Sequence, residues 1–524
     1  MRRRLQIIDC SKGFFCTRQK ALLELKTQEL RFYVWAELSG FQAHSNSDHH
    51  PRVLELIEGI LKEMVEAIAD TGKLVSQYGF ETLESDSVDF NAVPRKTTDR
   101  LRWALRDKKA LSELIDDLRE FNDGLLAAMS AWEQRTARFN ATTRLASSVS
   151  AIEDLQAIQD GAQDSDVLSR TAAFKILNLS FESPANTGSG SVSSHEISMN
   201  DLAFIQEQAE VFRSLAVVGS LTVLVEWKPY HHGTGKSSSG IPATMSIQRI
   251  GRLVTLLMSP TKPKDFQTLE CVGYTNDKFH SRVGIVFIIP GWNYLSGSAS
   301  VPEQLVMPWI TLENLMGKRP KLPLLGHRIS LALTLTKSMI HMHATGWYHK
   351  GYQSNNIVFI ADSSDQSYDA VDIREPKVAG FDYSRPRSNQ EASGDLEKFL
   401  VEHHEAYVPP EYLEYLMRGH SSERNDVERF KPRYDMFALG CVLLEVGLWR
   451  RMKDLWALYS SSKKKRGWID QLLFKYVPDL GGRCGERYQR VVTQLIIQSG
   501  SSRQSPELPL TYSEIIHLLE CIRT

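Results

Sequence analysis

The chain has few of the features that identify secreted, metal-binding or nucleic-acid-binding proteins. Its six cysteines are Cys10, Cys16, Cys271, Cys441, Cys484 and Cys521. They form no C-x-x-C pair, so neither a zinc site nor a disulfide framework is indicated, and a reducing, cytoplasmic location is expected. The net charge of -1 gives no argument for nucleic-acid binding, which depends on a clear excess of basic residues.

Long apolar runs are also missing. The most apolar stretch, Val283 to Ile289, stops at Pro290, well short of the roughly 20 residues that a membrane-spanning helix requires. Residues 2–4 are basic and the next four are largely apolar, but Asp9 interrupts them before a signal-peptide core can form. We therefore expect no secretion signal and no transmembrane segment.

The composition is that of a multidomain globular protein, with 524 residues of which 42% are hydrophobic and 24% charged. From Ala21 to Trp132 apolar residues recur every three or four positions, as in amphipathic helices. Residues 79–98 are polar and would connect two of these helices. The sequence predicts an all-α helical bundle over residues 1–140, followed by a linker over residues 141–204 that contains a Ser- and Gly-rich segment at residues 183–200.

The pattern changes after about residue 205. Short β-type runs surround one helical pattern; they are Leu221–Trp227, Thr268–Tyr274 and Val283–Ile289, with the helix at Ile247–Met258. From Gly326 onward helical patterns dominate again. We expect an α+β domain over residues 205–524, with a small strand-rich lobe over about 205–305 and a larger helical lobe over about 306–524.

One segment of the larger lobe resembles the catalytic loop of a protein kinase, which normally reads H-R-D-L-x-x-x-N. Here His349 and Asn356 keep the family's spacing, and an apolar strand follows Asn356. Lys350 keeps a positive charge where the family has arginine, but Gly351 stands at the position of the catalytic aspartate. The resemblance therefore implies a kinase-like loop that lacks its catalytic carboxylate.

Three further motifs follow in the kinase order. Gly380-Phe381-Asp382 resembles the D-F-G motif but reads G-F-D, and Pro410-Glu411 resembles the A-P-E signature. Asp435 stands where kinases carry the buried aspartate that braces the catalytic loop. Glu411 and Asp435 are therefore expected to be structural, and together the motifs predict a bilobal protein-kinase-like fold.

The departures from the kinase pattern affect the residues that hold magnesium and orient the acceptor hydroxyl. Gly351 and Gly380 offer no side chain for either task, and Asp382 lies two residues away, roughly 6–7 Å along an extended chain. Lys228 is a candidate for the phosphate-binding lysine and Asn356 for a remaining nucleotide-site residue. No G-x-G-x-x-G motif precedes Lys228 and the helix Ile247–Met258 contains no carboxylate to pair with it. We expect no cofactor; ATP and magnesium belong to the alternative in which the chain is an active kinase.

The amino-terminal part resembles another family. The segment Ala21–Phe41, which contains Arg31 and Trp35, is similar to the L-x-x-x-x-x-R-L-x-x-W-G helix of fungal HeLo domains, and residues 102–125 give a second match. This resemblance covers roughly the first 135 residues and implies a helical oligomerisation domain of the prion-inhibition and propagation type. The chain begins with residues 1–4, Met-Arg-Arg-Arg, and lacks the family's full apolar first helix. Either the HeLo domain is truncated, or this member signals without disturbing a membrane.

The leading hypothesis is a pseudokinase regulator of programmed cell death or of allorecognition, including heterokaryon incompatibility. A kinase-like sensor would signal to a helical domain that binds protein partners, including further copies of the chain. The alternatives are an atypical active protein kinase and a passive interaction scaffold. The basic run 463–466 could contact an anionic membrane surface, but such a run is more often a solvated loop between helices. The expected location is therefore the cytoplasm, with peripheral membrane attachment as an alternative, and no nucleic-acid partner is expected.

Overall fold

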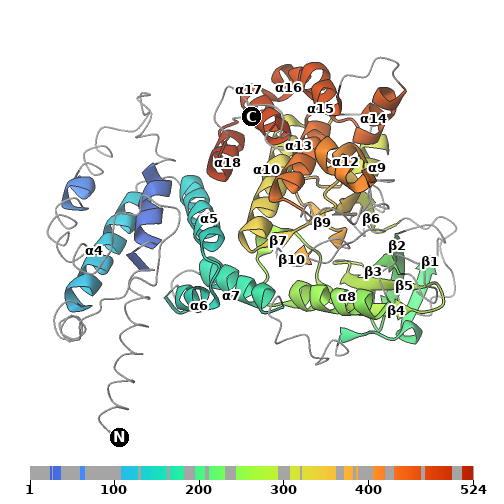
Figure 1. Ribbon diagram of the computed structural model, residues 1–524, viewed down its shortest axis with the longest axis horizontal. Helices are drawn as coiled ribbons and strands as arrows, with labels where there is room; N and C mark the ends of the chain where they lie inside the picture. Colours follow the sequence, from blue (N-terminus) through green and yellow to red (C-terminus); the bar gives the residue numbers. More distant parts are fainter. Residues whose placement is uncertain are drawn as a thin grey trace, which may run out of the picture. The chain divides into compact units, whose positions relative to one another are not determined.

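The structure is a computed structural model that divides the chain into two compact units, Met1–Ile176 and Leu177–Thr524. The residues that it describes are 24–25, 27–36, 59–64, 108–127, 131–161, 166–181, 195–206, 212–230, 243–292, 307–318, 322–361, 371–381, 385–386, 405–418, 430–461, 467–497 and 510–522. Figure 1 shows the helices and strands of both units with the labels used below. None of the helices in these ranges is long and apolar enough to cross a membrane.

The described part of the first unit is helical. Residues 27–36 and 59–64 are helical, and four longer helices follow: α4 (Lys108–Ala127), α5 (Ala131–Ser148), α6 (Ile152–Gly161) and α7 (Asp166–Ser180). The last residues of α7, from Leu177, belong to the second unit. Trp35, Leu125 and Ala137 form the centre of its core. The predicted amino-terminal helical region is therefore confirmed.

The structure differs from the sequence prediction over residues 141–204, where a linker was expected. Helices α6 and α7 lie within this range. Leu155 and Ile158 of α6 and Ala172 and Phe174 of α7 are buried, so one face of each helix is covered although both sequences are rich in polar residues. The Ser- and Gly-rich residues 182–194 lie outside the described ranges.

The second unit contains a five-stranded antiparallel sheet in the order β1-β2-β3-β5-β4. Its strands are β1 (Leu202–Gln206), β2 (Arg213–Val218), β3 (Leu221–Pro229), β4 (Cys271–Asp277) and β5 (Arg282–Ile288). Helix α8 (Ala243–Met258) connects β3 to β4 and packs against β4 and β5. The sheet confirms the prediction that the carboxy-terminal region contains β-strands. The predicted runs at 221–227, 268–274 and 283–289 overlap β3, β4 and β5.

The hairpin between β2 and β3 has a fixed register. Gly219 in the turn has φ +58°, a left-handed conformation that glycine adopts without steric cost. The resulting pairing places Arg213 directly opposite Glu226. Both residues are charged although most of the residues in their strands are apolar and buried.

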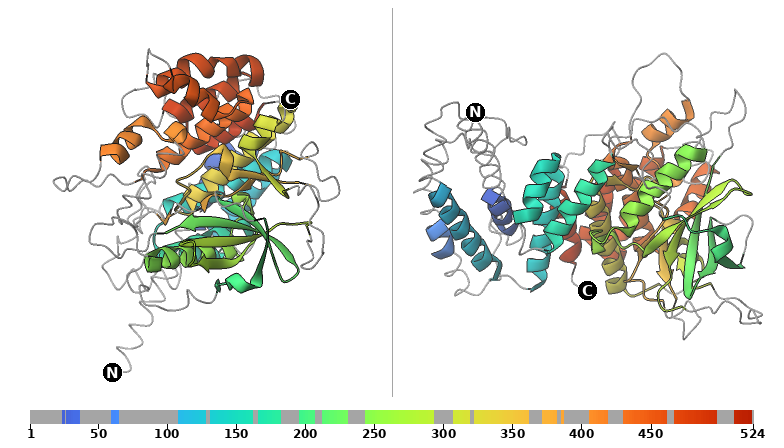
Figure 2. Two further views of the ribbon diagram at one scale, coloured as in Figure 1. Left: turned by 90° about the vertical axis from the view of Figure 1, so that its right-hand side faces the viewer. Right: turned by 90° about the horizontal axis from the view of Figure 1, so that it is seen from below.

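Helices form most of the rest of the second unit, which Figure 2 shows beside the green strands of the sheet. The helices are α9 (Leu312–Lys318), α10 (Leu325–Ala344), α12 (Pro410–Arg418), α13 (Pro432–Leu448), α14 (Met452–Ser460), α15 (Trp468–Gln471), α16 (Pro478–Cys484), α17 (Glu486–Ile497) and α18 (Tyr512–Glu520). Short strands accompany them: β6 (Trp309–Thr311), β7 (Trp347–Tyr348), β8 (Ile357–Ile360), β9 (Lys377–Val378) and β10 (Arg385–Pro386). The pairings are β6-β8-β9 and β10-β7.

Helix α13 is the centre of this helical part. Its residues from Tyr434 to Leu448 are all buried, and it packs against α10, α16 and α17. A helix that is apolar on every side must be surrounded by other elements. The first turn of α13 can therefore hold a polar side chain away from water and present it to a neighbouring loop.

Candidate functional site

The loop from His349 to Asn356 is anchored on the first turn of α13. Asp435 is 1% exposed, and its carboxylate accepts hydrogen bonds from the backbone N–H of His349 at 2.9 Å and of Lys350 at 2.8 Å. The Nε2 atom of His343 in α10 lies 3.2 Å from the same carboxylate. A buried carboxylate with several donors is costly to remove, so Asp435 fixes the backbone conformation of this loop.

The side chain of His349 joins this loop to the strand β9 region. Its Nε2 atom lies 2.9 Å from the carbonyl oxygen of Ala379, and the backbone N–H of Gly351 donates to its Nδ1 atom at 3.3 Å. An Nδ1 atom that accepts a hydrogen bond carries no proton, so Nε2 is the donor to Ala379. Burial lowers the pKa of His349, against the opposing effects of Asp435, the Ala379 carbonyl and Glu226. The imidazole is therefore held as a neutral structural link.

Arg213 and Glu226 form a buried ion pair on the sheet, where their side chains are 8% and 2% exposed. The Nε and Nη2 atoms of Arg213 donate to one carboxylate oxygen of Glu226 at 3.2 and 2.9 Å. The same guanidinium donates to the loop, from Nη1 to the carbonyl oxygen of Asn355 at 2.9 Å and from Nη2 to Oδ1 of Asn356 at 2.7 Å. The pair therefore connects the five-stranded sheet to the loop 349–356.

Glu226 completes a second connection. Its two carboxylate oxygens accept from the backbone N–H of Gly380 at 2.9 and 3.1 Å. Asn356, which receives Arg213, also donates from Nδ2 to the carbonyl oxygen of Gly351 at 2.8 Å. We call the four residues Arg213, Glu226, Asn356 and Gly380 the clamp, because their hydrogen bonds hold sheet and loop together.

Gly380 cannot be replaced by a larger residue without moving the clamp. Its φ is +80°, and a Cβ atom built at this position would lie 2.1–2.6 Å from side-chain atoms of Asn356. Carbon atoms do not approach other heavy atoms so closely, and L-residues with a side chain rarely adopt this backbone conformation. An aspartate at this position would therefore displace Asn356 and, with it, the acceptor of Arg213.

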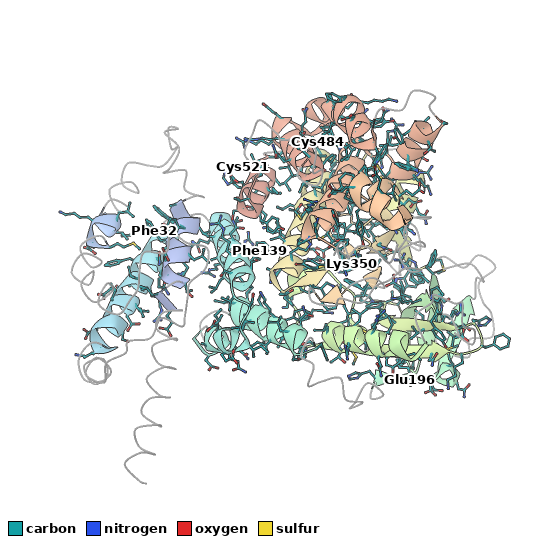
Figure 3. All side chains as sticks on the ribbon, in the orientation of Figure 1. Phe32, Phe139, Glu196, Lys350, Cys484 and Cys521 are labelled. Carbon is teal, nitrogen blue, oxygen red and sulfur yellow. The ribbon has the colours of Figure 1, made fainter. Side chains whose placement is uncertain are left out.

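The other predicted site residues lie at various distances from the clamp. Lys228 is partly buried and lies on β3 two residues beyond Glu226, opposite Val283; its predicted role at a nucleotide site stays a prediction. Lys350, labelled in Figure 3, has φ +64° and its ammonium lies 5.3 Å from the Phe430 ring. Glu411 pairs with Arg433 at 2.5 Å. The predicted marker Asp382 lies outside the described residues.

A second buried acidic residue braces the other end of the loop. Glu445 of α13 accepts hydrogen bonds from the Ser354 and Tyr407 hydroxyl groups, both at 3.0 Å, and from the backbone N–H of Met452. Burial raises the pKa of Glu445 to about 8. Asp435 and Glu445 together attach this loop to α13 at two points separated by most of the helix.

Sequence reasoning missed Arg213 and Glu226, although the sequence contains a signal for them. Glu226 is a charge within the apolar run of β3, and a buried charge requires a partner. The two-residue turn after Val218 sets the hairpin register, which places Arg213 opposite Glu226. Reading the register before assigning the lysine would have identified this pair.

The chemistry of these groups does not fit a bound magnesium nucleotide. Within the ranges that the structure describes, no cluster of three or more His, Cys, Asp or Glu side chains could hold a metal ion. The carboxylate of Glu226 would repel phosphate, and the hydrogen bonds of Arg213 are directed to protein groups. The arrangement holds two parts of the second unit together through hydrogen bonds.

Comparison with known families supports the helical part of the chain. Residues 87–158 match the HeLo family, described as prion-inhibition and propagation. No curated protein matches the chain. The matched segment includes α4 and α5 of the first unit and agrees with the HeLo resemblance predicted from the sequence, which is consistent with a role in signalling or cell death.

Proposed function

We propose that residues from about 205 to 524 form a protein-kinase-like domain of the pseudokinase type, in which the clamp replaces the nucleotide. The order of elements supports this proposal. A five-stranded sheet with one helix between β3 and β4 precedes a helical part, and the loop 349–356 hydrogen-bonds to that sheet through Arg213. The position of Asp435 under the loop is what the resemblance to kinases predicts for a bracing aspartate.

The observation that supports loss of activity most strongly is the buried ion pair between Arg213 and Glu226. A kinase needs a cation for the phosphates of ATP and carboxylates for magnesium. In this chain a carboxylate, Glu226, is the group that contacts Gly380, the position of the first D-F-G residue. The pairing of Glu226 with Arg213 and Gly380 and the lack of space for a side chain at Gly380 both argue against a magnesium nucleotide.

In this proposal the kinase-like domain is a regulator and the helical unit is the output. The HeLo match at residues 87–158 supports an output that acts through association with protein partners, including other copies of the chain, in the cytoplasm or at an anionic membrane surface. A change that opens the clamp would be the signal. The competing functions are an active atypical kinase and a passive scaffold.

Measurements of nucleotide binding and phosphate transfer distinguish the proposed pseudokinase from an active kinase. The full-length protein is mixed with magnesium and ATP, and its melting temperature, its retention of ATP in equilibrium dialysis and phosphate transfer to a generic substrate are measured. A nucleotide present at a hundredfold excess over its Kd would stabilise the fold by about 2.7 kcal/mol, so absence of any shift is a clear result. We expect no shift, no retention and no transfer. Magnesium-dependent transfer that Lys228→Ala abolishes would instead establish an active kinase.

Reintroducing the missing carboxylate gives a further test of the same site. Gly380→Asp should destabilise the second unit and should restore no transfer, because its Cβ atom cannot coexist with the present position of Asn356. Transfer activity in Gly380→Asp without loss of stability would contradict the proposal.

The oligomeric state of the protein, and its response to opening the clamp, distinguishes a regulator from a passive scaffold. Sedimentation of the full-length protein over a range of concentrations should show oligomers, and Glu226→Ala, which opens the clamp, should change their distribution. A chain that stays monomeric at every concentration, or oligomers that do not respond to Glu226→Ala, would favour the passive scaffold.

A further inference from the structure

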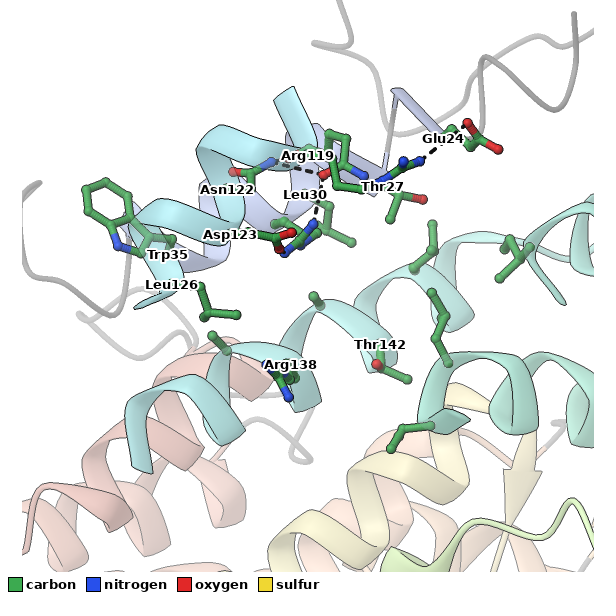
Figure 4. A pocket seen from close by; sticks show the side chains of 18 of the residues that line it. Glu24, Thr27, Leu30, Trp35, Arg119, Asn122, Asp123, Leu126, Arg138 and Thr142 are labelled. Atoms are coloured by element: carbon green, nitrogen blue, oxygen red, sulfur yellow. Dashed lines mark hydrogen bonds and ion pairs between the residues drawn. The ribbon is translucent and has the colours of Figure 1, made fainter. Parts of the chain in front are cut away.

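The first unit contains a pocket of about 380 Å³, within the range typical of small-molecule sites. Figure 4 shows it between two groups of helices, with Leu30 and Asn122 on one side and Arg138 and Thr142 of α5 on the other. Residues of α6 and α7 complete the lining. This pocket is independent of the clamp, since all its lining residues belong to the first unit.

Part of the wall of the pocket is apolar. Leu30 and Leu126 line one side, and Leu145, Ile158 and Leu168 line the other. Two alanines, Ala137 and Ala141, occupy consecutive turns on the same face of α5 and also line the pocket. Because their side chains are small, they leave space that leucine would fill at the same positions. The wall therefore fits an apolar chain.

The charged residues of the lining leave one cation without an acidic partner. Arg31 forms an ion pair with Asp123, and Arg119 lies 3.9 Å from Glu24. These pairs use both acidic residues that line the pocket. Arg138 is exposed and forms no ion pair with any other residue in the described ranges, so the lining carries one uncompensated positive charge.

A hydroxyl group lies next to this cation. Thr142 is one helical turn after Arg138, so the two side chains lie on the same face of α5. Thr142 is buried and also lines the pocket. A guanidinium beside a hydroxyl donor is a suitable environment for a carboxylate, which accepts strong charge-assisted hydrogen bonds from both.

We propose that this pocket binds one long-chain carboxylate, a ligand of the fatty-acid class. The carboxylate lies at Arg138 and Thr142, and the apolar chain runs along Leu30, Leu126 and Ile158. The volume admits a single chain, so a free fatty acid is the ligand rather than a two-chain lipid in a bilayer. Binding joins the two groups of helices that form the walls and stabilises the helical unit.

The test uses the full-length protein and a fluorescent polyene fatty acid as the probe. Its binding is measured by titration, and palmitate, methyl palmitate and the matched long-chain alcohol are added as competitors. We expect palmitate to displace the probe and the ester and alcohol to compete about tenfold less well or worse, since each lacks the charged acceptor. Vesicles of anionic phospholipid without free fatty acid should not displace the probe.

Two variants locate the site. Arg138→Gln should weaken palmitate binding about tenfold or more while leaving binding of the ester unchanged. The matched control is Arg135→Gln, an exposed arginine on the same helix that does not line the pocket. Ala141→Leu fills the space and should abolish binding of acid and ester alike, and a thermal melt of each variant confirms that it folds.

Four outcomes, besides the one for Ala141→Leu given below, would overturn the inference. They are no saturable binding of the probe, equal competition by acid and ester, equal effects of Arg138→Gln and Arg135→Gln, and displacement of the probe by anionic vesicles alone. Unchanged binding in a folded Ala141→Leu variant would place the ligand elsewhere on the protein and would contradict this pocket as its site.

Discussion

Removing one member of the buried ion pair in the clamp should destabilise the second unit strongly. In Glu226→Ala the guanidinium of Arg213 keeps its hydrogen bonds to Asn355 and Asn356 but loses the neutralising charge, and the N–H of Gly380 loses its acceptor. An uncompensated buried charge costs about 3–5 kcal/mol. For a unit of this size we expect a fall in melting temperature of about 5–10 °C.

A double-mutant cycle separates the interaction free energy of the Arg213–Glu226 pair from the contribution of each residue. The free energy of unfolding is measured by urea titration for Glu226→Leu, Arg213→Met and the double variant, with Asp479→Asn as an exposed control. The double variant removes both charges and leaves only neutral groups unpaired, so it should be less destabilised than the sum of the singles by at least about 1 kcal/mol. The control should stay within about 0.5 kcal/mol of the wild type.

Additivity would refute this reasoning. If the double variant loses the sum of the two single losses within about 0.5 kcal/mol, the two residues act independently and the clamp is not a unit. A Glu226→Ala variant as stable as Asp479→Asn would show that this carboxylate is hydrated and not buried between sheet and loop.

Two further predictions concern the bracing carboxylates. Asp435→Ala should lower the free energy of unfolding by about 1–3 kcal/mol or more, because it leaves the N–H groups of His349 and Lys350 without an acceptor, and Asn356→Ala should lower it clearly less; equal losses in urea titrations would contradict this order. Burial raises the pKa of Glu445 from 4.5 to about 8 in the folded chain. As the pH rises, the unfolded chain therefore loses the Glu445 proton at a lower pH than the folded chain does. Stability should therefore fall between pH 4.5 and 8, by at most about 1.4 kcal/mol per pH unit, and a Glu445→Gln variant with an unchanged pH slope would show that another group causes the fall.

The larger elements of the second unit could be predicted because their sequences carry a clear period or a clear composition. The apolar runs of β3 and β5 and the helical pattern of α8 each indicate one structure. Strands β1 and β2 were not predicted, because the short run Leu202–Gln206 and the run that starts at Arg213 are too brief to distinguish from loop segments. Helices α6 and α7 were missed because their buried faces carry few large apolar residues.

The site residues that belong to a motif with fixed spacing could be predicted, whereas those that depend on a cross-strand partner were not. His349, Asn356 and Asp435 lie within one connected set of hydrogen bonds, at the positions that the motif spacing indicated. Glu226 and Lys228 lie on the same face of β3, because successive side chains of a strand alternate, so the pattern of β3 by itself does not decide which of them reaches the loop. That choice depends on Arg213, which is paired across the hairpin.

The double hydrogen bond from Gly380 to Glu226 also has an evolutionary consequence. A substitution of Gly380 by a metal-binding aspartate would clash with Asn356. A substitution of Glu226 would instead leave the Arg213 cation buried without a counterion. Each single step passes through a poorly folded intermediate, whereas only several simultaneous changes avoid it. The residues at these positions are therefore epistatic, and such a chain would diversify on its surface while the interior of this junction stays fixed.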